Sequence, residues 1–144
     1  MQEINWLEML AYKEELNALS RNLLVPSQNK TLTNSELELL SLIYLAKEKA
    51  TPLELSNMSG MKKEAVSRSL KKLFELETIN KIKNQDDERS YSLKLTAKGN
   101  ALLNENYEII LKPFYELYRL MGDDFIKMFS LLKTANQYIN TNRS

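Results

Sequence analysis

The stretch that decides the fold is MKKEAVSRSLKKLF, residues 61–74. Val66, Leu70 and Leu73 are spaced four and three residues apart, which places them on one face of an α-helix. The opposite face carries polar and basic side chains, namely Lys63, Ser67, Arg68, Lys71 and Lys72. The pattern predicts a helix that packs inward on one side and presents cations to solvent on the other.

The segments on either side of this helix complete a recognisable unit. Residues 51–58 are helix-forming, and Ser59-Gly60 separates them from the basic helix. Two short helices joined by a glycine-containing turn are typical of a helix-turn-helix. Downstream, residues 79–83 and 91–95 alternate apolar and polar side chains like two strands, and the polar residues 84–90 between them suit a hairpin tip. The sequence therefore predicts a winged helix.

Longer helices are predicted at both ends of the chain. Apolar residues recur at helical spacing over residues 3–24, 97–121 and from residue 123 onward. A capping box formed by Thr33 and Glu36 starts a helix whose apolar residues 37–45 cover most of its circumference, so we expect that helix to be buried. The fold class predicted is mainly α (α+β).

The terminal helices carry more apolar surface than one winged helix can cover. A seam with heptad-like spacing runs along the helix of residues 97–121 and usually faces another helix; it consists of Leu103, Tyr107, Ile110, Phe114, Leu117 and Met121. We expect a symmetric homodimer. The predicted parts are an N-terminal dimerisation helix (1–31), a winged helix-turn-helix domain (32–99) and C-terminal dimerisation helices (100–144).

Composition excludes several classes of protein. The 144 residues include no cysteine and no histidine, which removes disulfides, thiol chemistry, Cys/His zinc sites and a histidine base. No constellation of carboxylates or Ser–Lys pairs suggests an enzyme, and we expect no cofactor and no metal. No apolar run approaches the roughly 18 residues of a membrane span, and the N-terminus does not resemble a signal peptide, so we expect a cytoplasmic protein.

Charge is distributed unevenly along the chain. Residues 61–98 carry ten Lys and Arg against six Asp and Glu, whereas residues 1–60 carry five against eight. A basic balance confined to the helix-turn-helix and hairpin is the pattern of a DNA-binding surface. A solvated helix face would give the same charge, so this observation leaves both interpretations open.

A family resemblance carries the argument further. Residues 87–99, DERSYSLKLTAKG, fit the wing pattern D-x-R-x-x-x-L-x-L-T-x-x-G of the MarR family of bacterial transcriptional regulators, which this sequence resembles. The resemblance implies a dimeric winged-helix regulator, with repression the expected mode, that binds a pseudo-palindromic operator and is released by a small aromatic or other organic effector. Two positions depart from the family: Glu77 replaces a usual glycine, and Lys62 replaces a Ser or Asp cap. The first predicts an altered start of the wing.

Individual side chains can be given roles in DNA binding. We expect Ser67 and Arg68 to reach base edges in the major groove, because arginine can bind guanine through two hydrogen bonds. Lys62, Lys63, Lys71 and Lys72 suit phosphate contacts. Arg89 at the hairpin tip suits a narrow minor groove, with Asp87 as the side chain that orients it.

Alternatives remain at this point. Trp6, Tyr12, Tyr44 and Tyr107 either line an effector cavity or belong to the core and the dimer interface. Gly99 suits a packing role near the start of its helix. The competing function is a helical interaction protein that has the winged-helix scaffold but binds little DNA.

Overall fold

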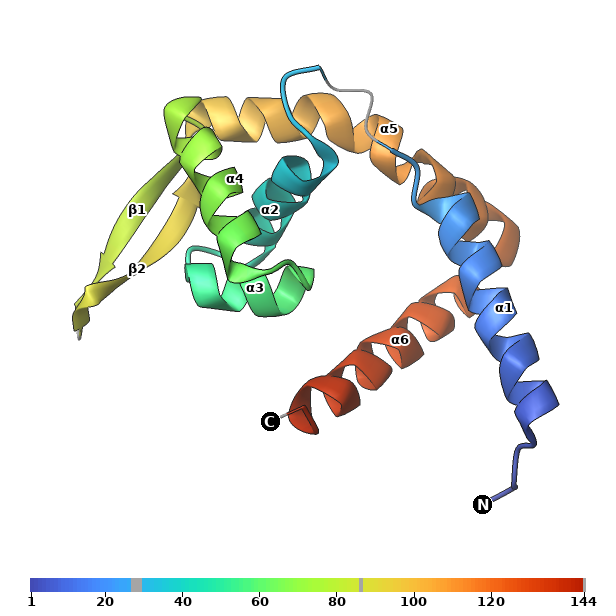
Figure 1. Ribbon diagram of the computed structural model, residues 1–144. Coiled ribbons are helices and arrows are strands. Elements are labelled where there is room, and N and C mark those ends of the chain that lie inside the picture. Colours follow the sequence, from blue (N-terminus) through green and yellow to red (C-terminus); the bar gives the residue numbers. More distant parts are fainter. Residues whose placement is uncertain (27–29, 86, 144) are drawn as a thin grey trace. The chain divides into compact units, whose positions relative to one another are not determined.

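The computed structural model describes residues 1–26, 30–85 and 87–143, with the side chains of Asp87 and Glu88 excepted (Figure 1). Helices and one two-stranded antiparallel sheet make up this part of the chain. Their bounds are α1 (Trp6–Leu23), α2 (Asn34–Leu45), α3 (Pro52–Ser59), α4 (Lys63–Glu75), β1 (Ile79–Asn84), β2 (Asp87–Leu95), α5 (Ala97–Met121) and α6 (Asp123–Thr141).

The chain divides into two compact units. The central unit is Pro26–Ile109, and the terminal unit combines Met1–Val25 with Ile110–Ser144. Helix α5 contributes its first half to the central unit and its second half to the terminal unit. The winged helix thus lies within the central unit, and the two chain ends make up most of the terminal one.

The core of the central unit lies between α2, α3, α4 and the hairpin. Val66, Leu70 and Leu73 of α4 are buried as predicted, and they pack with a set of buried side chains that includes Leu37, Leu39, Leu40, Ile43, Leu55, Ile79 and Leu93. Helix α4 crosses in front of α2 in Figure 1, and the hairpin projects from the other side of α4. This arrangement leaves the second face of α4 exposed.

Helix α2 is less buried than its sequence predicts. Tyr44 and Leu45 at its C-terminal end are 60% and 71% exposed. Both residues follow Ile43, which is the last buried residue of α2. The expectation of a helix buried all round is wrong for its last turn.

The helix caps explain where the helices begin. Thr33 and Glu36 form the predicted capping box, in which the Thr33 hydroxyl accepts from the Glu36 N–H at 3.2 Å and the Glu36 carboxylate accepts from the Thr33 N–H at 3.1 Å. Thr51 caps α3 in front of Pro52. A second complete box, which was not predicted, starts α1 and consists of Asn5 with Glu8.

The hairpin is longer on one side than expected. Ile79 pairs with Leu95, and the ladder runs out to Lys83 opposite Tyr91, after which a bulge shifts the register so that Asn84 pairs with Asp87. Residues 87–90, predicted as part of the tip, therefore belong to β2. At the base of the hairpin, the Leu93 N–H donates to the Ala50 carbonyl at 3.0 Å.

Gly99 is where the start of α5 meets the beginning of the hairpin. The residue is buried, and a Cβ there would collide with the carbonyl oxygen of Thr78. The Thr96 hydroxyl accepts from the Gly99 N–H at 3.1 Å and donates to the Glu77 carbonyl at 2.7 Å. The predicted packing role of Gly99 is confirmed.

The terminal unit has little interior. Among its described residues, 1–25 and 110–143, only Leu23 is buried. Its internal contacts include aromatic pairs: the ring centroids of Phe125 and Phe129 lie 4.5 Å apart, and those of Tyr118 and Phe125 lie 5.4 Å apart. Over the described residues, no helix has the length and apolar content required to cross a membrane.

Candidate nucleic-acid interface

The exposed face of α4 is held rigidly by the opposite, buried face. Lys63, Ser67, Arg68 and Lys71 are all exposed, while Val66, Leu70 and Leu73 anchor the same turns in the core. Side chains at i, i+4 and i+8 lie above one another on a helix, so Lys63, Ser67 and Lys71 form one row with Arg68 beside it. The structure thus brings the predicted contact residues of α4 onto one surface.

The start of α4 is set by the turn before it. Gly60 takes the left-handed conformation, with φ of +73°, which ends α3. The Ser56 hydroxyl then donates to the Met61 carbonyl at 2.7 Å and ties the turn to α3. Lys62 occupies the N-cap position of α4 and makes no capping hydrogen bond, so its exposed ammonium lies at the end of the helix where the backbone N–H groups point outward.

Lys72 differs from the other cations of α4 because it has a partner within the fold. Its ammonium nitrogen lies 2.8 Å from Oε1 of Glu36, and the Glu36 side chain is only 4% exposed. The same carboxylate oxygen accepts the Thr33 N–H in the capping box of α2. Burial raises the pKa of Glu36, but the hydrogen bonds from Lys72 and Thr33 outweigh this and leave the pKa lowered.

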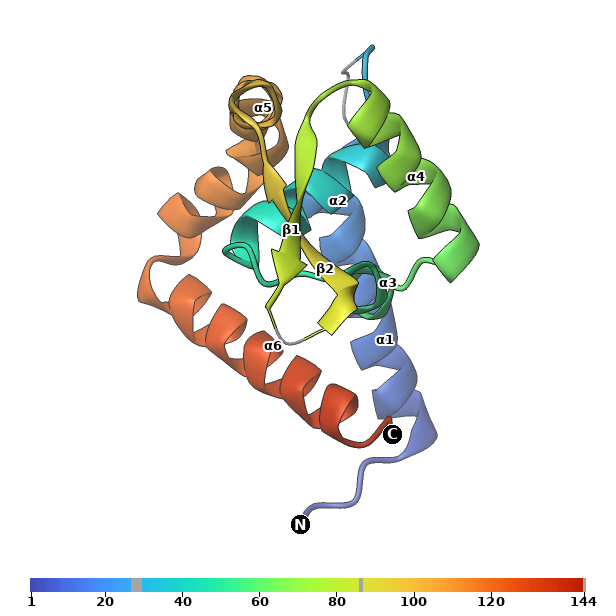
Figure 2. The same ribbon diagram turned by 90° about the vertical axis from the view of Figure 1, so that its left-hand side faces the viewer.

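The pairing of Lys72 with Glu36 does not follow from the sequence. The local patterns predict a helix cap for Glu36 and a DNA contact for Lys72, and the two residues are far apart in the chain. A near-complete burial of Glu36 follows from the packing of α4 across α2, which no local pattern reveals. Figure 2 shows both helices in the central unit.

The hairpin tip is organised by one amide. The Asn84 side-chain nitrogen donates to the Ser90 hydroxyl at 2.8 Å, and its oxygen accepts from the Ser92 hydroxyl at 3.1 Å. These bonds join β1 to β2 beside the bulge, next to Arg89, which is exposed. The side chain of Asp87, predicted to orient Arg89, lies outside the described residues.

Cation–π contacts of one lysine also connect the hairpin to α4. The Lys81 ammonium lies 4.5 Å from the ring centroid of Tyr91 in β2 and 5.5 Å from that of Phe74 in α4. Such contacts contribute roughly 0.5–1 kcal/mol each at exposed sites. Sequence reasoning missed this cluster, because Lys81 lies opposite Leu93 and reaches Tyr91 only as a diagonal neighbour on the next strand.

The start of the wing is not altered by the unusual residue at position 77. Glu77 has φ of +59°, the left-handed conformation that a glycine would take there. Its N–H donates to the Phe74 carbonyl at 3.0 Å, and the following Thr78 N–H donates to the Leu73 carbonyl at 3.0 Å. The helix end therefore keeps the geometry of a glycine turn, and the predicted change is wrong.

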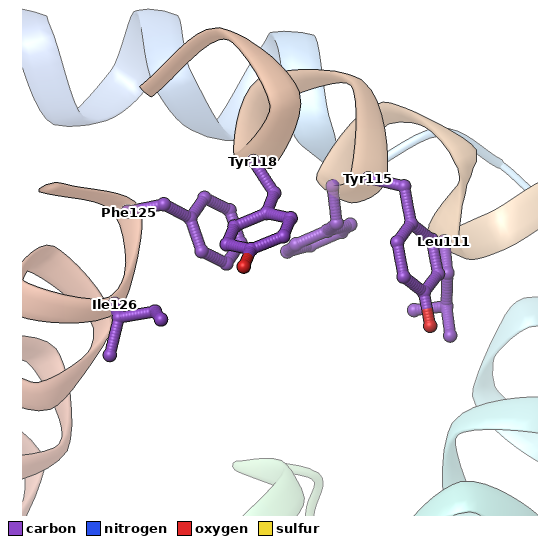
Figure 3. Close-up of a pocket in the computed structure, with 6 residues that line it drawn as sticks. Leu111, Tyr115, Tyr118, Phe125 and Ile126 are labelled. Atoms are coloured by element: carbon purple, nitrogen blue, oxygen red, sulfur yellow. The ribbon is translucent and has the colours of Figure 1, made fainter. Parts of the chain in front are cut away.

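The aromatic residues predicted for an effector cavity do not gather within one unit. Trp6 and Tyr12 belong to the terminal unit, Tyr44 and Tyr107 to the central one, and all four are exposed. A different apolar cleft of about 430 Å³ lies in the terminal unit between α5 and α6 (Figure 3). Its lining consists of Leu111, Phe114, Tyr115, Tyr118, Phe125 and Ile126.

Metal binding finds no support in this geometry. Over the described part of the chain, acidic side chains do not gather into any group of three that could hold an ion. The chain also has no histidine or cysteine. The chemistry available at the exposed faces is that of cations, hydroxyls and amides, which bind phosphates and base edges.

Comparison with known proteins identifies similar transcriptional regulators. The family described as "Transcriptional regulator SarA/Rot" matches residues 24–106. The HTH-type transcriptional regulator TcaR of Staphylococcus aureus is 30% identical over 141 residues, which cover 96% of this chain and 91% of TcaR.

Solved structures share the fold over nearly the whole chain. The crystal structure of Streptococcus pneumoniae FabT in complex with DNA has a TM-score of 0.67 at 21% identity, covering 92% of this chain and 98% of FabT. Wild-type MarR from E. coli has a TM-score of 0.58 at 20% identity, covering 93% and 98%. The chain thus belongs to the SarA/Rot family of transcriptional regulators, which is built on the MarR-type winged helix, and is not an enzyme.

Proposed function

We propose that this regulator binds double-stranded DNA as a homodimer, with α4 of each protomer in a major groove. The observation that carries the proposal is the row of exposed side chains on α4, Lys63, Ser67 and Lys71 with Arg68 beside it, on a helix whose other face is locked in the core. Structures of the same fold support it, since FabT was crystallised with DNA and a MarR mutant with operator DNA.

The contact residues then divide by chemistry. Arg68 and Ser67 reach base edges, while Lys62, Lys63 and Lys71 neutralise phosphates on either side of the groove. Arg89 enters the adjacent minor groove from the hairpin tip, oriented by Asp87. Binding should therefore combine a strong dependence on salt with a sequence preference that depends mainly on Arg68.

Dimerisation accounts for the terminal unit. Large apolar side chains on α1 and α6 remain exposed, for example Trp6 at 74% and Leu131 at 70%. Exposed apolar surface on this scale marks a protein–protein interface. None of the seam residues of α5 is fully buried, which fits the same role. A two-fold dimer would present two copies of α4 to a pseudo-palindromic operator with half-sites about one helical turn apart.

A small organic effector and a cytoplasmic location complete the proposal. The apolar cleft between α5 and α6 has the size of a small-molecule site. A panel of substituted phenols and aromatic acids, added to the protein–DNA complex, should contain members that release the DNA. The cytoplasm is where a regulator would meet chromosomal DNA.

Selection of bound duplexes from a random pool tests the function. We expect a recovered consensus with two-fold symmetry and an affinity that falls steeply with salt. Light scattering at micromolar concentration should give twice the protomer mass of 16.8 kDa. If no consensus emerges and a heparin column does not retain the protein, it is instead a helical interaction protein on a winged-helix scaffold.

A further inference from the structure

We propose that Lys72 is a positioning residue: its ion pair with Glu36 fixes the C-terminal half of α4 against the start of α2, and Lys72 does not contact DNA phosphate. The inference rests on the proposed DNA-binding function, because the position of α4 matters only if α4 reads DNA. Lys72 thus has a role different from that of the other lysines of α4.

The geometry around Glu36 supports this assignment. The 2.8 Å separation between the Lys72 ammonium and Glu36 Oε1 is that of a charge-assisted hydrogen bond. The Glu36 side chain is 4% exposed, so its charge would be left in the protein interior if Lys72 turned outward to a phosphate. Removing one partner from such a buried charge is more costly than breaking a pair on the surface. We therefore expect Lys72 to remain paired with Glu36 when DNA is bound.

The connection also reaches a fixed point of the backbone. Glu36 is the third residue of the capping box of α2, and the oxygen that binds Lys72 also accepts the Thr33 N–H at 3.1 Å. Lys72 is thereby joined to the first turn of α2 rather than to a mobile surface side chain. Together with the buried Leu70 and Leu73, this bond sets how far α4 can rotate or slide on α2.

A matched neighbour makes the inference testable. Lys71 is exposed on the adjacent position of the same helix, and no ion pair of Lys71 occurs among the described residues. Lys71→Ala in both protomers should remove two phosphate contacts and reduce the slope of log affinity against log salt by about 1.8. Lys72→Ala should lower affinity by about three- to tenfold and leave the salt slope unchanged.

The partner substitution gives the sharper contrast. Glu36→Gln retains the capping box, which accepts Gln as well as Glu, but removes the charge that holds Lys72. If Lys72 positions α4, Glu36→Gln lowers DNA affinity by a factor similar to that of Lys72→Ala, and the double variant loses no more than either single one. If Lys72 binds phosphate, Glu36→Gln frees the ammonium, and affinity stays equal or rises. Lys72→Arg should restore wild-type affinity, because a guanidinium can pair with Glu36.

All variants are measured as full chains on the duplex selected by the wild-type protein, with urea unfolding to establish that each is folded. Lys72→Met, which keeps the apolar stem, serves if Lys72→Ala does not fold. A wild-type protein that binds no duplex overturns the proposed function and this inference together. A wild-type protein that binds, with Lys72→Ala reducing the salt slope as Lys71→Ala does, overturns this inference alone.

Discussion

The central and terminal units use apolar residues in opposite ways. In the central unit, Leu39, Leu40, Leu55 and Leu73 are fully buried. Helix α4 packs into this core with its basic face outward. In the terminal unit, Leu120 is 85% exposed and Leu131 is 70% exposed. Leucine is about equally frequent in the two units, and the terminal unit has more of the aromatic residues, so a lack of apolar residues does not explain its exposure. The central unit thus has a core within one chain, whereas the terminal unit leaves apolar surface that the proposed dimer would bury.

The largest effect should come from truncating one leucine in each unit. Leu39→Ala should lower the free energy of unfolding by about 2–5 kcal/mol, because it removes a fully buried side chain and leaves a cavity. Leu131→Ala makes the same chemical change at an exposed position, and we expect its cost mainly in the dimer dissociation constant. Urea unfolding and light scattering over a range of protein concentrations separate the two. Equal losses of unfolding free energy would mean that the terminal unit has a core of its own.

Substitution on the exposed face of α4 should affect DNA binding without affecting dimerisation. Arg68→Ala should cost about 1–3 kcal/mol of binding on the selected duplex and relax the preference at one position in each half-site. The mass in light scattering should not change, because Arg68 belongs to the central unit. Fluorescence anisotropy with matched and mismatched duplexes measures the effect. A uniform loss on every sequence would make Arg68 a phosphate contact instead.

The backbone at the end of α4 offers a substitution that should stabilise the central unit. Glu77→Gly should raise the free energy of unfolding by about 0.5–1 kcal/mol, since the left-handed conformation strains glutamate but not glycine, and part of the gain is offset in the unfolded chain. Glu77→Ala is the control, because alanine suffers the same strain and should give no gain. A loss of stability with glycine would contradict the reading of this turn.

Protonation of Glu36 at acid pH should lower the free energy of unfolding of the central unit, by less than the substitutions above. The folded protein holds the pKa of Glu36 below its ordinary value of 4.5, so the stability that this carboxylate contributes is complete above pH 4.5. It is lost as the pH falls through the lowered pKa. The difference in unfolding free energy between wild type and Glu36→Gln should shrink over that range. A difference that stays constant with pH would show that the charge of Glu36 does not contribute.

The smallest change in stability is expected at the tip of the wing. Arg89→Ala should alter the free energy of unfolding by about 0.5 kcal/mol or less, because the side chain is exposed. DNA affinity should nevertheless fall, most on duplexes with A·T-rich flanks if Arg89 enters the minor groove. Binding by the variant is compared on A·T-flanked and G·C-flanked duplexes. Unchanged affinity on both would falsify a role of the wing in binding.

The parts of the fold that sequence predicts well are those set by local patterns. The stripe of Val66, Leu70 and Leu73 specified the buried face of α4, and the capping box of Thr33 and Glu36 specified where α2 starts. The structure departs from expectation where a contact joins distant segments. The pairing of Lys72 with Glu36 requires α4 to cross α2, and the position of Lys81 between Phe74 and Tyr91 requires three elements to meet.

A second limit is that residue type does not decide backbone conformation. Glu77 replaces a glycine of the family pattern and still adopts the glycine conformation, because the hydrogen bonds of the neighbouring turn outweigh the strain of one residue. Tyr44 and Leu45 are apolar enough for a core but lie beyond the face that α2 buries. In both places the tertiary structure, and not the residue type, determines the conformation or the burial.

The hydrogen bonds at the base of the hairpin have a consequence for its motion. The Leu93 N–H is bonded to Ala50, and the Thr96 N–H to Thr78, so both amides can exchange with solvent deuterium only when the central unit opens. The bulge beyond Lys83 interrupts the ladder and exposes the outer residues to local opening. Deuterium uptake should therefore be slow at Leu93 and Thr96 and faster at Arg89 and Ser90. If Arg89 binds DNA as proposed, local opening of this outer part of the hairpin would let Arg89 change position while α4 keeps its place in the core.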